Sequence, residues 1–315
     1  MQKDHQRGYH IVSQFKGTYV FKQDGIEIGR SSNLITSNGR KMILQYLSGG
    51  RLDWAADMAI GAINSVSPSL SDTQLNFETL RCPVTLKTFI SANTVANNPD
   101  LVVVRSTIPV GVYANIYEIG LYGISNSGYS TSTRNNVILD NFSNLNNWSL
   151  SVGTVIPTPY IAQGASSPRI GANSISFQPR TTYVCPNTSI SFSNYTTLDS
   201  LQLLVFNTTA SSTGITVILT DSSGATQNLV FATTATAGYS VISAPFTSSI
   251  TNFSTITSIS ISTDSSTYAT IDAIKVSSAN QISFEETLVS KSILTNPIAK
   301  DANSPLDIEY YVELL

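Results

Sequence analysis

The last stretch of the chain, SPLDIEYYVELL (304–315), alternates apolar and polar side chains with a period of two. The apolar set is Leu306, Ile308, Tyr310, Val312 and Leu314, and the intervening set is Asp307, Glu309, Tyr311 and Glu313. Successive side chains of a strand point to opposite faces, so this pattern predicts a β-strand buried on one face. Such a strand needs neighbouring strands, which must come from earlier in the chain.

The N-terminal third supplies those neighbours together with one helix. Residues 17–30 predict a hairpin, with Asp24-Gly25 in the tight turn that this dipeptide favours. The run SNGRKMILQYLSGG (37–50) predicts a helix near 38–48, capped by Ser37 or Asn38 and ended by Gly49-Gly50. Further strands are predicted at 56–63, 82–91, 100–109, 115–123 and 286–298.

The middle of the chain contains strand-like runs separated by turn signals. They lie at 136–142, 148–153, 173–178, 188–193, 200–207, 214–221, 226–232, 238–246, 254–263 and 268–277. Many short strands without a helix between them are typical of two packed sheets. The whole chain is therefore predicted to be all-β, with the helix near 38–48 as its exception.

The charge density changes near residues 136 and 281. The chain has 17 basic and 20 acidic residues, and only eight of them lie between these positions. Two segments with such different surfaces are expected to form separate domains. We predict a discontinuous β-sandwich outer domain, 1–135 plus 282–315, whose last strand pairs with strands before residue 124, and an inserted β-sandwich domain, 136–281.

The overall composition excludes several classes of protein. Charged residues make up 12% of the chain and the net charge is −3, so clustered basic residues for nucleic acid are absent. No apolar run reaches the roughly 18 residues of a membrane span, and Met1 to His10 lacks the apolar core of a signal peptide. Cys82 and Cys185 fall in different predicted domains and are expected to be free thiols.

The sequence offers little catalytic chemistry. His5 and His10 are the only histidines, so the body of the chain cannot supply an imidazole for a catalytic triad or a metal site. The segment 136–281 contains no glutamate, and the spacing of its aspartates does not single out a glycosidase pair. The prediction is that the protein is not an enzyme, and that Glu118 in the YEIG run is a structural partner.

The outer segments resemble a known group of proteins. The runs SSNLITSNGRKMILQYLSGG (31–50), ADMAIGAIN (56–64) and VVVRSTIPVGVYANIYEIGLYG (102–123) are similar to the opening of tailed-bacteriophage virion proteins. The finish NPIAKDANSPLDIEYYVELL (296–315) is similar to that of tail, baseplate and head-appendage proteins. The resemblance covers about half the chain and implies a virion location, with other virion proteins and symmetric copies of the chain as partners.

The middle segment resembles the jelly roll of many carbohydrate-binding modules. The resemblance rests on its opening, LDNFSNLNNWSLSVG (139–153), and on its closing strand, YATIDAIKVS (268–277). In that group an aspartate near the last strand often lies beside a structural calcium. The resemblance therefore implies that Asp140 and Asp272 lie close together and begin an oxygen-rich calcium shell. The alternative is that both aspartates satisfy turns and caps.

Sugar binding needs an aromatic platform and a few polar partners. The candidates are Trp148, Tyr160 and Tyr183 as platforms, with Tyr195, Tyr239 and Tyr268 as further rings, and Arg169, Arg180 and Asn187 as polar partners. A core position is the alternative for Trp148, because it occupies a strand-like run. Tyr160 lies in the proline-flanked run VIPTPYIAQG, which is typical of a loop.

These observations predict a non-enzymatic bacteriophage structural protein that anchors through its outer domain and displays a β-sandwich for weak adhesion to host-surface glycans. Two alternatives stay open at this point. One is a purely architectural decoration or spacer protein, and the other is a free glycan-binding lectin or adhesin. Head and tail locations are not distinguished by these motifs.

Overall fold

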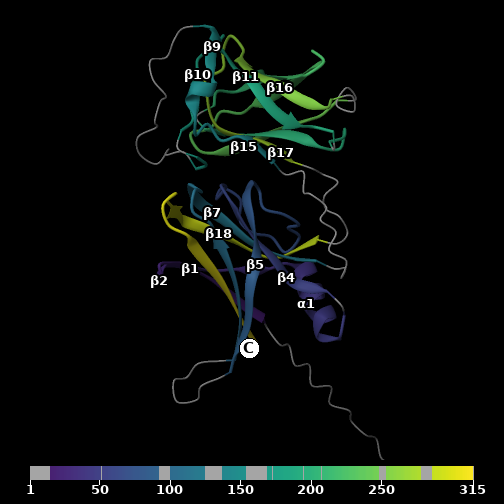
Figure 1. The fold of residues 1–315 in the computed structure, drawn as a ribbon, viewed down its shortest axis with the longest axis vertical. Coiled ribbons are helices and arrows are strands. Elements are labelled where there is room, and N and C mark those ends of the chain that lie inside the picture. The colour runs from purple at the N-terminus through teal and green to yellow at the C-terminus, as the bar shows by residue number, and fades with distance from the viewer. Residues whose placement is uncertain are drawn as a thin grey trace, which may run out of the picture.

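The structure, a computed structural model, describes residues 15–50, 52–91, 100–124, 137–153, 169–171, 173–193, 195–206, 208–247, 253–277 and 286–314. The chain forms two β-rich bodies stacked end to end (Figure 1). The predicted all-β class with a single α-helix is confirmed within these residues. Both predicted domain boundaries, 135/136 and 281/282, lie outside the described residues.

One body, which we call the outer domain, contains a nine-stranded sheet. Its elements are β1 (Phe15–Gln23), β2 (Ile26–Ser32), β3 (Leu34–Ile35), α1 (Ser37–Leu47), β4 (Asp53–Gly61), β5 (Glu78–Ile90), β6 (Leu101–Ile108), β7 (Ala114–Ile124), β18 (Glu286–Lys300) and β19 (Leu306–Leu314). The strand order is β2-β1-β19-β6-β5-β4-β7-β18-β3. The sheet curls on itself. β2 and β18 lie near opposite ends of the strand order, yet the hydroxyls of Ser31 and Ser292 on these strands are 2.6 Å apart.

The C-terminal strand completes this sheet, as its alternating pattern predicts. β19 pairs with β1 on one side and β6 on the other, and Tyr19 faces the buried Tyr310 across the β1–β19 ladder. One polar position departs from the alternation: Glu309 is only 2% exposed. Its carboxylate forms ion pairs with Lys22 at 2.6 Å and with Arg105, both on the flanking strands. These two cations make burial of the carboxylate tolerable.

Helix α1 begins at Ser37, and its N-cap lies one residue before the first of the two predicted caps. The N-cap is Thr36, whose hydroxyl accepts a hydrogen bond from the Gly39 amide at 2.9 Å and donates one to the Leu288 carbonyl at 2.5 Å. The sequence prediction of Ser37 or Asn38 as the cap is therefore wrong. Thr36 is the cap because its hydroxyl is buried and forms hydrogen bonds with both α1 and β18, whereas both predicted residues are exposed.

The other body, the inserted domain, is a sandwich of two sheets. Its elements are β8 (Val137–Asp140), a 3₁₀ turn (Leu145–Asn147), β9 (Ser149–Val152), β10 (Ile175–Phe177), β11 (Thr182–Ser191), β12 (Ser200–Phe206), β13 (Ser211–Asp221), β14 (Thr226–Thr233), β15 (Ser240–Pro245), β16 (Thr255–Thr263) and β17 (Ala269–Ser277). We call β10-β17-β12-β15, with β8 beside β17, the near sheet. The far sheet is β14-β13-β16-β11-β9.

The two sheets of the inserted domain enclose one apolar core. Its largest members are aromatic or branched residues from both sheets, including Phe177, Phe192, Phe231, Ile259 and Ile274. Burial of such side chains supplies most of the favourable free energy of folding, at about 25 cal/mol per Å² of apolar surface. Cys185 lies in this core and Cys82 in the outer core, and both are free thiols as expected.

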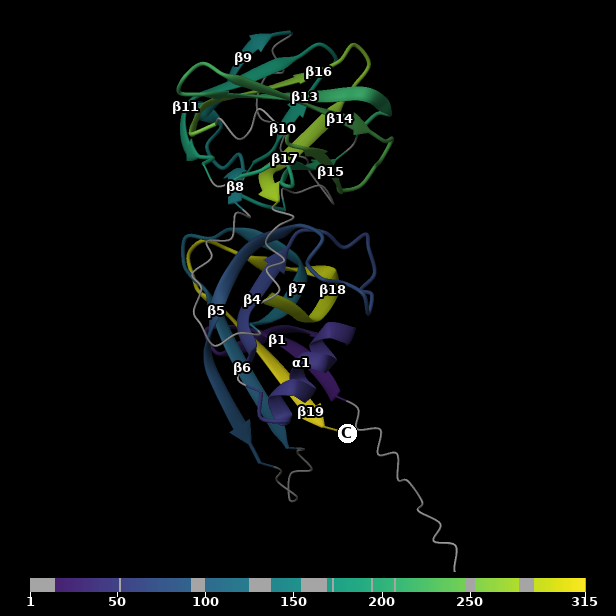
Figure 2. The ribbon, with the colours of Figure 1, turned by 90° about the vertical axis from the view of Figure 1, so that its right-hand side faces the viewer.

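The stacking gives the molecule two different ends. The near sheet faces the outer domain and the far sheet lies away from it, while the end of β19 lies at the opposite end of the molecule (Figures 1 and 2). The inserted domain lies in the chain between β7 and β18, which are neighbouring strands of the outer sheet, and Ile124 of β7 pairs with Glu286 of β18. Among the described residues, no helix combines the length and apolar character that a membrane crossing requires.

Candidate binding site at the domain interface

The segment that joins β4 to β5, residues 63–76, is held in shape by a buried carboxylate. Glu118 of β7 is fully buried and accepts hydrogen bonds from three backbone amides: Ile63 at 3.0 Å, Asn76 at 2.7 Å and Phe77 at 3.1 Å. One side chain therefore ties together both ends of the segment. This gives Glu118 the structural role expected from the sequence.

A buried lysine of β18, Lys291, contacts the same segment. Lys291 of β18 is 1% exposed, and its Nζ lies 3.1 Å from Asp72 Oδ2 and 3.8 Å from Glu118 Oε2. The same Nζ donates to the Gln74 carbonyl at 3.4 Å. Burial raises the pKa of Glu118, while the charge of Lys291 acts in the opposite direction. A paired, hydrogen-bonded arrangement of this kind is what makes buried charges tolerable.

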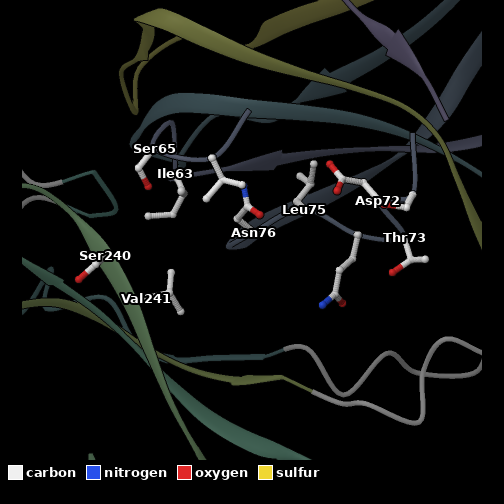
Figure 3. Close-up of a pocket in the computed structure, with 11 residues that line it drawn as sticks. Ile63, Ser65, Asp72, Thr73, Leu75, Asn76, Ser240 and Val241 are labelled. Atoms are coloured by element: carbon white, nitrogen blue, oxygen red, sulfur yellow. The ribbon is translucent and has the colours of Figure 1, made fainter. Parts of the chain in front are cut away.

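A cavity of about 510 Å³ lies between this segment and β15 of the inserted domain. Figure 3 shows Ser240 and Val241 across the cavity from Ile63, Leu75 and Asn76. Most of its polar side chains are neutral: Ser65, Ser71, Thr73, Gln74, Asn76 and Ser240. Two polar atoms of residues on opposite sides of the cavity, Asn76 Nδ2 and Ser240 Oγ, are buried without a hydrogen-bond partner among the described residues.

Arg169 of the inserted domain fixes the two bodies to each other. Its guanidinium donates to the Ala62 carbonyl at 2.5 Å and to Asn64 Oδ1 at 3.2 Å, both in the outer domain. The guanidinium carbon also lies 3.8 Å from the ring centre of Tyr117 and 4.2 Å from that of Tyr239. Cation–π contacts of this kind are worth about 2 kcal/mol when they are desolvated.

Two further charged residues of β17 are buried at the interface. Asp272 accepts from the backbone amides of Arg169 at 2.8 Å and Ile170 at 3.2 Å, and burial raises its pKa to about 7. Burial lowers the pKa of Lys275 to about 8, although the negative charges of Glu78 and Glu118 in the outer domain act to raise it. The Lys275 ammonium lies 5.0 Å from the ring centre of Phe77 in the outer domain.

The structure distributes the predicted sugar-binding residues over separate places. Trp148 is 8% exposed, packs on Phe142, and its indole donates to Asp140 Oδ2 at 2.9 Å. Tyr183 packs edge-on against Phe177 at 5.2 Å, so its ring also serves the core. Tyr183 lies in β11 and packs against the core, whereas Trp148 follows the 3₁₀ turn and is held inside by Phe142 and Asp140.

The polar partners in that prediction do not converge either. Arg180 and Asn187 are exposed and have positive φ angles of 59° and 62°, in a turn and at a bulge of β11. Arg169 is 7% exposed and bonded to the outer domain rather than presented to solvent. Tyr195 and Tyr239 are buried, Tyr268 is 54% exposed, and Tyr160 lies outside the described residues.

The predicted calcium pair has a mixed outcome. β8 and β17 pair, as expected, and Asp140 stands opposite Ile274 in the ladder. The two carboxylates serve different groups, however: Asp140 accepts from Phe142 and Trp148, and Asp272 from the backbone beside it in space. Within the described residues, no three His, Cys, Asp or Glu side chains are grouped to hold a metal ion. These carboxylate partners do not fit a calcium shell, and a calcium ion stays a prediction.

Sequence reasoning named Arg169 and Asp272 for other roles, and it missed Lys275 and the interface itself. The inserted domain has only three cations, Arg169, Arg180 and Lys275. Two of these three are buried, against the usual exposure of arginine and lysine, because the outer domain supplies their partners. The cavity itself had no sequence signal, because its serines, threonines and amides are common throughout this chain.

Comparisons with known proteins give few relatives. The sequence matches no family model and no curated protein. Among solved structures, PfGH50B is similar over 35% of this chain at 15% identity and a TM-score of 0.28, and the chain covers 20% of that protein. The family 11 carbohydrate-binding module of the Clostridium thermocellum cellulase Lic26A-Cel5E is 15% identical over 47% of this chain and 97% of that module, with a TM-score of 0.33.

A viral structure is also similar over a long alignment. The infectious bursal disease virus Gt strain structure is 11% identical over 96% of this chain and 81% of that chain, with a TM-score of 0.21. TM-scores this low support no argument about this chain. The functional case therefore depends on the residues themselves.

Proposed function

We propose that this chain is a non-enzymatic structural protein of a tailed-bacteriophage particle, which anchors through its outer domain and displays the inserted domain for weak adhesion to host-surface glycans. The virion location comes from the resemblance of the outer segments to tailed-phage proteins. The division of labour between the two bodies comes from their arrangement. In this proposal the protein works as repeated copies, because virion sites repeat by symmetry.

The observation that carries the proposal is the contrast between the two ends of the molecule. Exposed apolar side chains gather on the outer domain around α1 and β5, where Leu47 and Phe89 are each 65% exposed. These residues line a largely apolar cavity of about 260 Å³ together with Trp54 and Val312. Exposed apolar surface with aromatic residues is typical of a protein–protein contact, so this end suits attachment to the particle.

The opposite end suits contact with a neutral partner. Along β16 of the far sheet, Ser258, Ser260 and Ser262 alternate with buried isoleucines and are partly exposed. Thr216 and Thr182 stand opposite Ser262 on the flanking strands. An uncharged, hydroxyl-rich face can bind sugars only weakly, and many copies on one particle would multiply that affinity.

One observation favours a second candidate, a purely architectural spacer. Of the aromatic residues described in the inserted domain, Tyr268 alone is more than half exposed, and the others pack in cores or at the interface. Glycan platforms normally use exposed rings. The buried charges of the interface would give a spacer the rigidity that it needs.

The test uses the full chain as a labelled protein. Binding to a glycan array and to intact host cells, with and without calcium, is expected to show saturable, low-affinity adhesion that increases when the chain is displayed in many copies. Negative-stain imaging of particles that carry a labelled copy is expected to place the label on the virion. If the chain adheres to no glycan and no cell while the label is found on the particle, the result favours the architectural spacer. Label on neither head nor tail would contradict the proposal as a whole.

A further inference from the structure

The cavity between segment 63–76 and β15 belongs to both domains at once. Its volume of about 510 Å³ falls in the range of roughly 300–1,000 Å³ that is typical of small-molecule sites. We propose that this cavity binds a small, neutral, polyhydroxylated ligand, such as one residue of a glycan chain, and that both domains hold the ligand together. The ligand class rests on the proposed glycan adhesion, but the location is new, since the site is the domain interface rather than an exposed sheet face.

The outer-domain wall of the cavity is fixed before any ligand arrives. Glu118 holds the amides of Ile63 and Asn76, and Leu75 donates its amide to the Tyr122 hydroxyl at 3.1 Å. Lys291 holds the segment between these points through Asp72. A binding wall with backbone groups already ordered loses little conformational entropy when a ligand binds.

The charge of the cavity selects a neutral ligand. Asp72 is the one acidic residue of the described lining, which holds no lysine or arginine, and its Oδ2 lies 3.1 Å from Lys291 Nζ. The Lys291 ammonium, which also lies 3.8 Å from Glu118, offsets the carboxylate of Asp72, and the described lining holds no cation that would attract a phosphate. Around it, hydroxyl and amide groups offer both donors and acceptors, which is the mixture that a sugar hydroxyl matches.

Two buried polar atoms give the ligand a specific place to bind. Asn76 Nδ2 on the outer-domain wall and Ser240 Oγ on the inserted-domain wall have no hydrogen-bond partner among the described residues. A buried donor without a partner carries a free-energy cost that a ligand acceptor can remove. The terminal torsion of an asparagine is soft, so a small rotation turns the Asn76 amide toward the cavity. A ligand hydroxyl that accepts from this amide recovers the lost free energy.

The rest of the lining matches the apolar faces of a sugar ring. Ile63 and Leu75 contribute aliphatic surface from the outer domain, and Val241 contributes it from the opposite wall (Figure 3). Ligand sites commonly combine such apolar surface with a few polar groups that fix orientation. Because the two polar anchors lie on different domains, the bound ligand would bridge them.

The test is a titration of the full chain with the methyl glycosides of glucose, galactose, mannose and N-acetylglucosamine, followed by saturation-transfer NMR. The wild-type chain is expected to transfer saturation to at least one of the four. Thr73→Trp places a bulky ring in the cavity wall and is expected to weaken binding at least tenfold. The matched control is Thr197→Trp in an exposed turn of the inserted domain, outside the cavity lining, which is expected to change binding less than twofold.

A second variant separates ligand contact from a change of fold. Asn76→Leu removes the side-chain amide but keeps the backbone amide, which donates to Glu118. The variant is expected to bind the same glycoside severalfold more weakly, while its thermal unfolding temperature stays near that of the wild type. Saturation transfer to none of the four glycosides, or equal transfer by the wild type and Thr73→Trp, overturns the inference.

Host-cell adhesion distinguishes this inference from the proposed function. If Thr73→Trp adheres to cells and binds the glycoside as well as the wild type does, the adhesive function stands and the cavity assignment is overturned. If the wild type binds a glycoside in the cavity but adheres to no cell, the cavity assignment is supported and the adhesive function fails.

Discussion

Arg169 of the inserted domain places its guanidinium carbon 3.8 Å from the ring centre of Tyr117 in the outer domain. The same guanidinium donates to the Ala62 carbonyl, so one side chain combines a cation–π contact with a hydrogen bond across the interface. The charge is removed from water, and these contacts compensate it together with a hydrogen bond to Asn64. Arg169 is therefore the residue on which the domain interface depends most directly.

Replacing Arg169 tests this dependence. Arg169→Met keeps the length of the side chain but removes the donors, and is expected to lower the free energy of unfolding by about 2–4 kcal/mol in a urea titration. The matched control is Arg180→Met, an exposed arginine of the same domain, which is expected to change stability by less than about 0.5 kcal/mol. Equal effects of the two variants would contradict the role of Arg169.

Asp272 is expected to make stability depend on pH. Burial raises its pKa from an ordinary value near 4 to about 7, so the folded state holds a proton that the unfolded state releases between these values. The free energy of unfolding should therefore fall as the pH rises from about 4 to 7, by roughly 3 kcal/mol from this residue. Asp272→Asn, which cannot titrate, should show a flatter profile over this range. The same slope in both proteins would assign the pH dependence to other groups.

The cap of α1 gives a prediction that separates the structure from the sequence pattern. Thr36→Ala removes the buried hydroxyl that accepts from Gly39 and donates to Leu288, and is expected to cost about 1–2 kcal/mol of stability. Ser37 is exposed and is one of the two residues that the pattern offered as the cap, and Ser37→Ala is expected to cost less than about 0.5 kcal/mol. Denaturant unfolding of both variants measures the difference, and the reverse order would restore Ser37 as the cap.

The pairing of Ile124 with Glu286 predicts that the outer domain can fold without the inserted one. These two residues stand opposite each other, so a short Asn-Gly turn can replace residues 125–285 and join β7 to β18 as a hairpin. The shortened chain retains Trp54 as its single tryptophan, whose fluorescence should show a cooperative unfolding transition. A chain without such a transition would show that the outer sheet requires the inserted domain.

The strands were predictable because most of them have one apolar face. Leu306, Ile308 and Tyr310 alternate strictly, and the structure buries all three in the outer core. The ten strands of the inserted domain are also found, although β11 begins at Thr182 rather than 188, before the bulge at Asn187. Local patterns specify such elements, whereas a bulge depends on the backbone of the partner strand.

The interface was not predictable, because it depends on contacts between residues far apart in the chain. In β17, Asp272 and Lys275 occupy positions that suggest solvent in a one-sided strand, yet nearly every residue of β17 is buried. The reason is that β17 has the sandwich core on one face and the outer domain on the other. Glu309 follows the same logic, since cations on the neighbouring strands make its burial possible.

The burial of Arg169 and Lys275 has a consequence for work with excised fragments. If the inserted domain were cut out, both cations would become exposed beside apolar residues such as Leu204 and Ala273 of the near sheet. The fragment would then present an apolar surface, with Asp272 beside the two cations, that the intact protein keeps covered. Exposed apolar surface of this kind adheres non-specifically to other molecules. An excised domain would therefore acquire an artificial affinity for the very cell surfaces used to assay it.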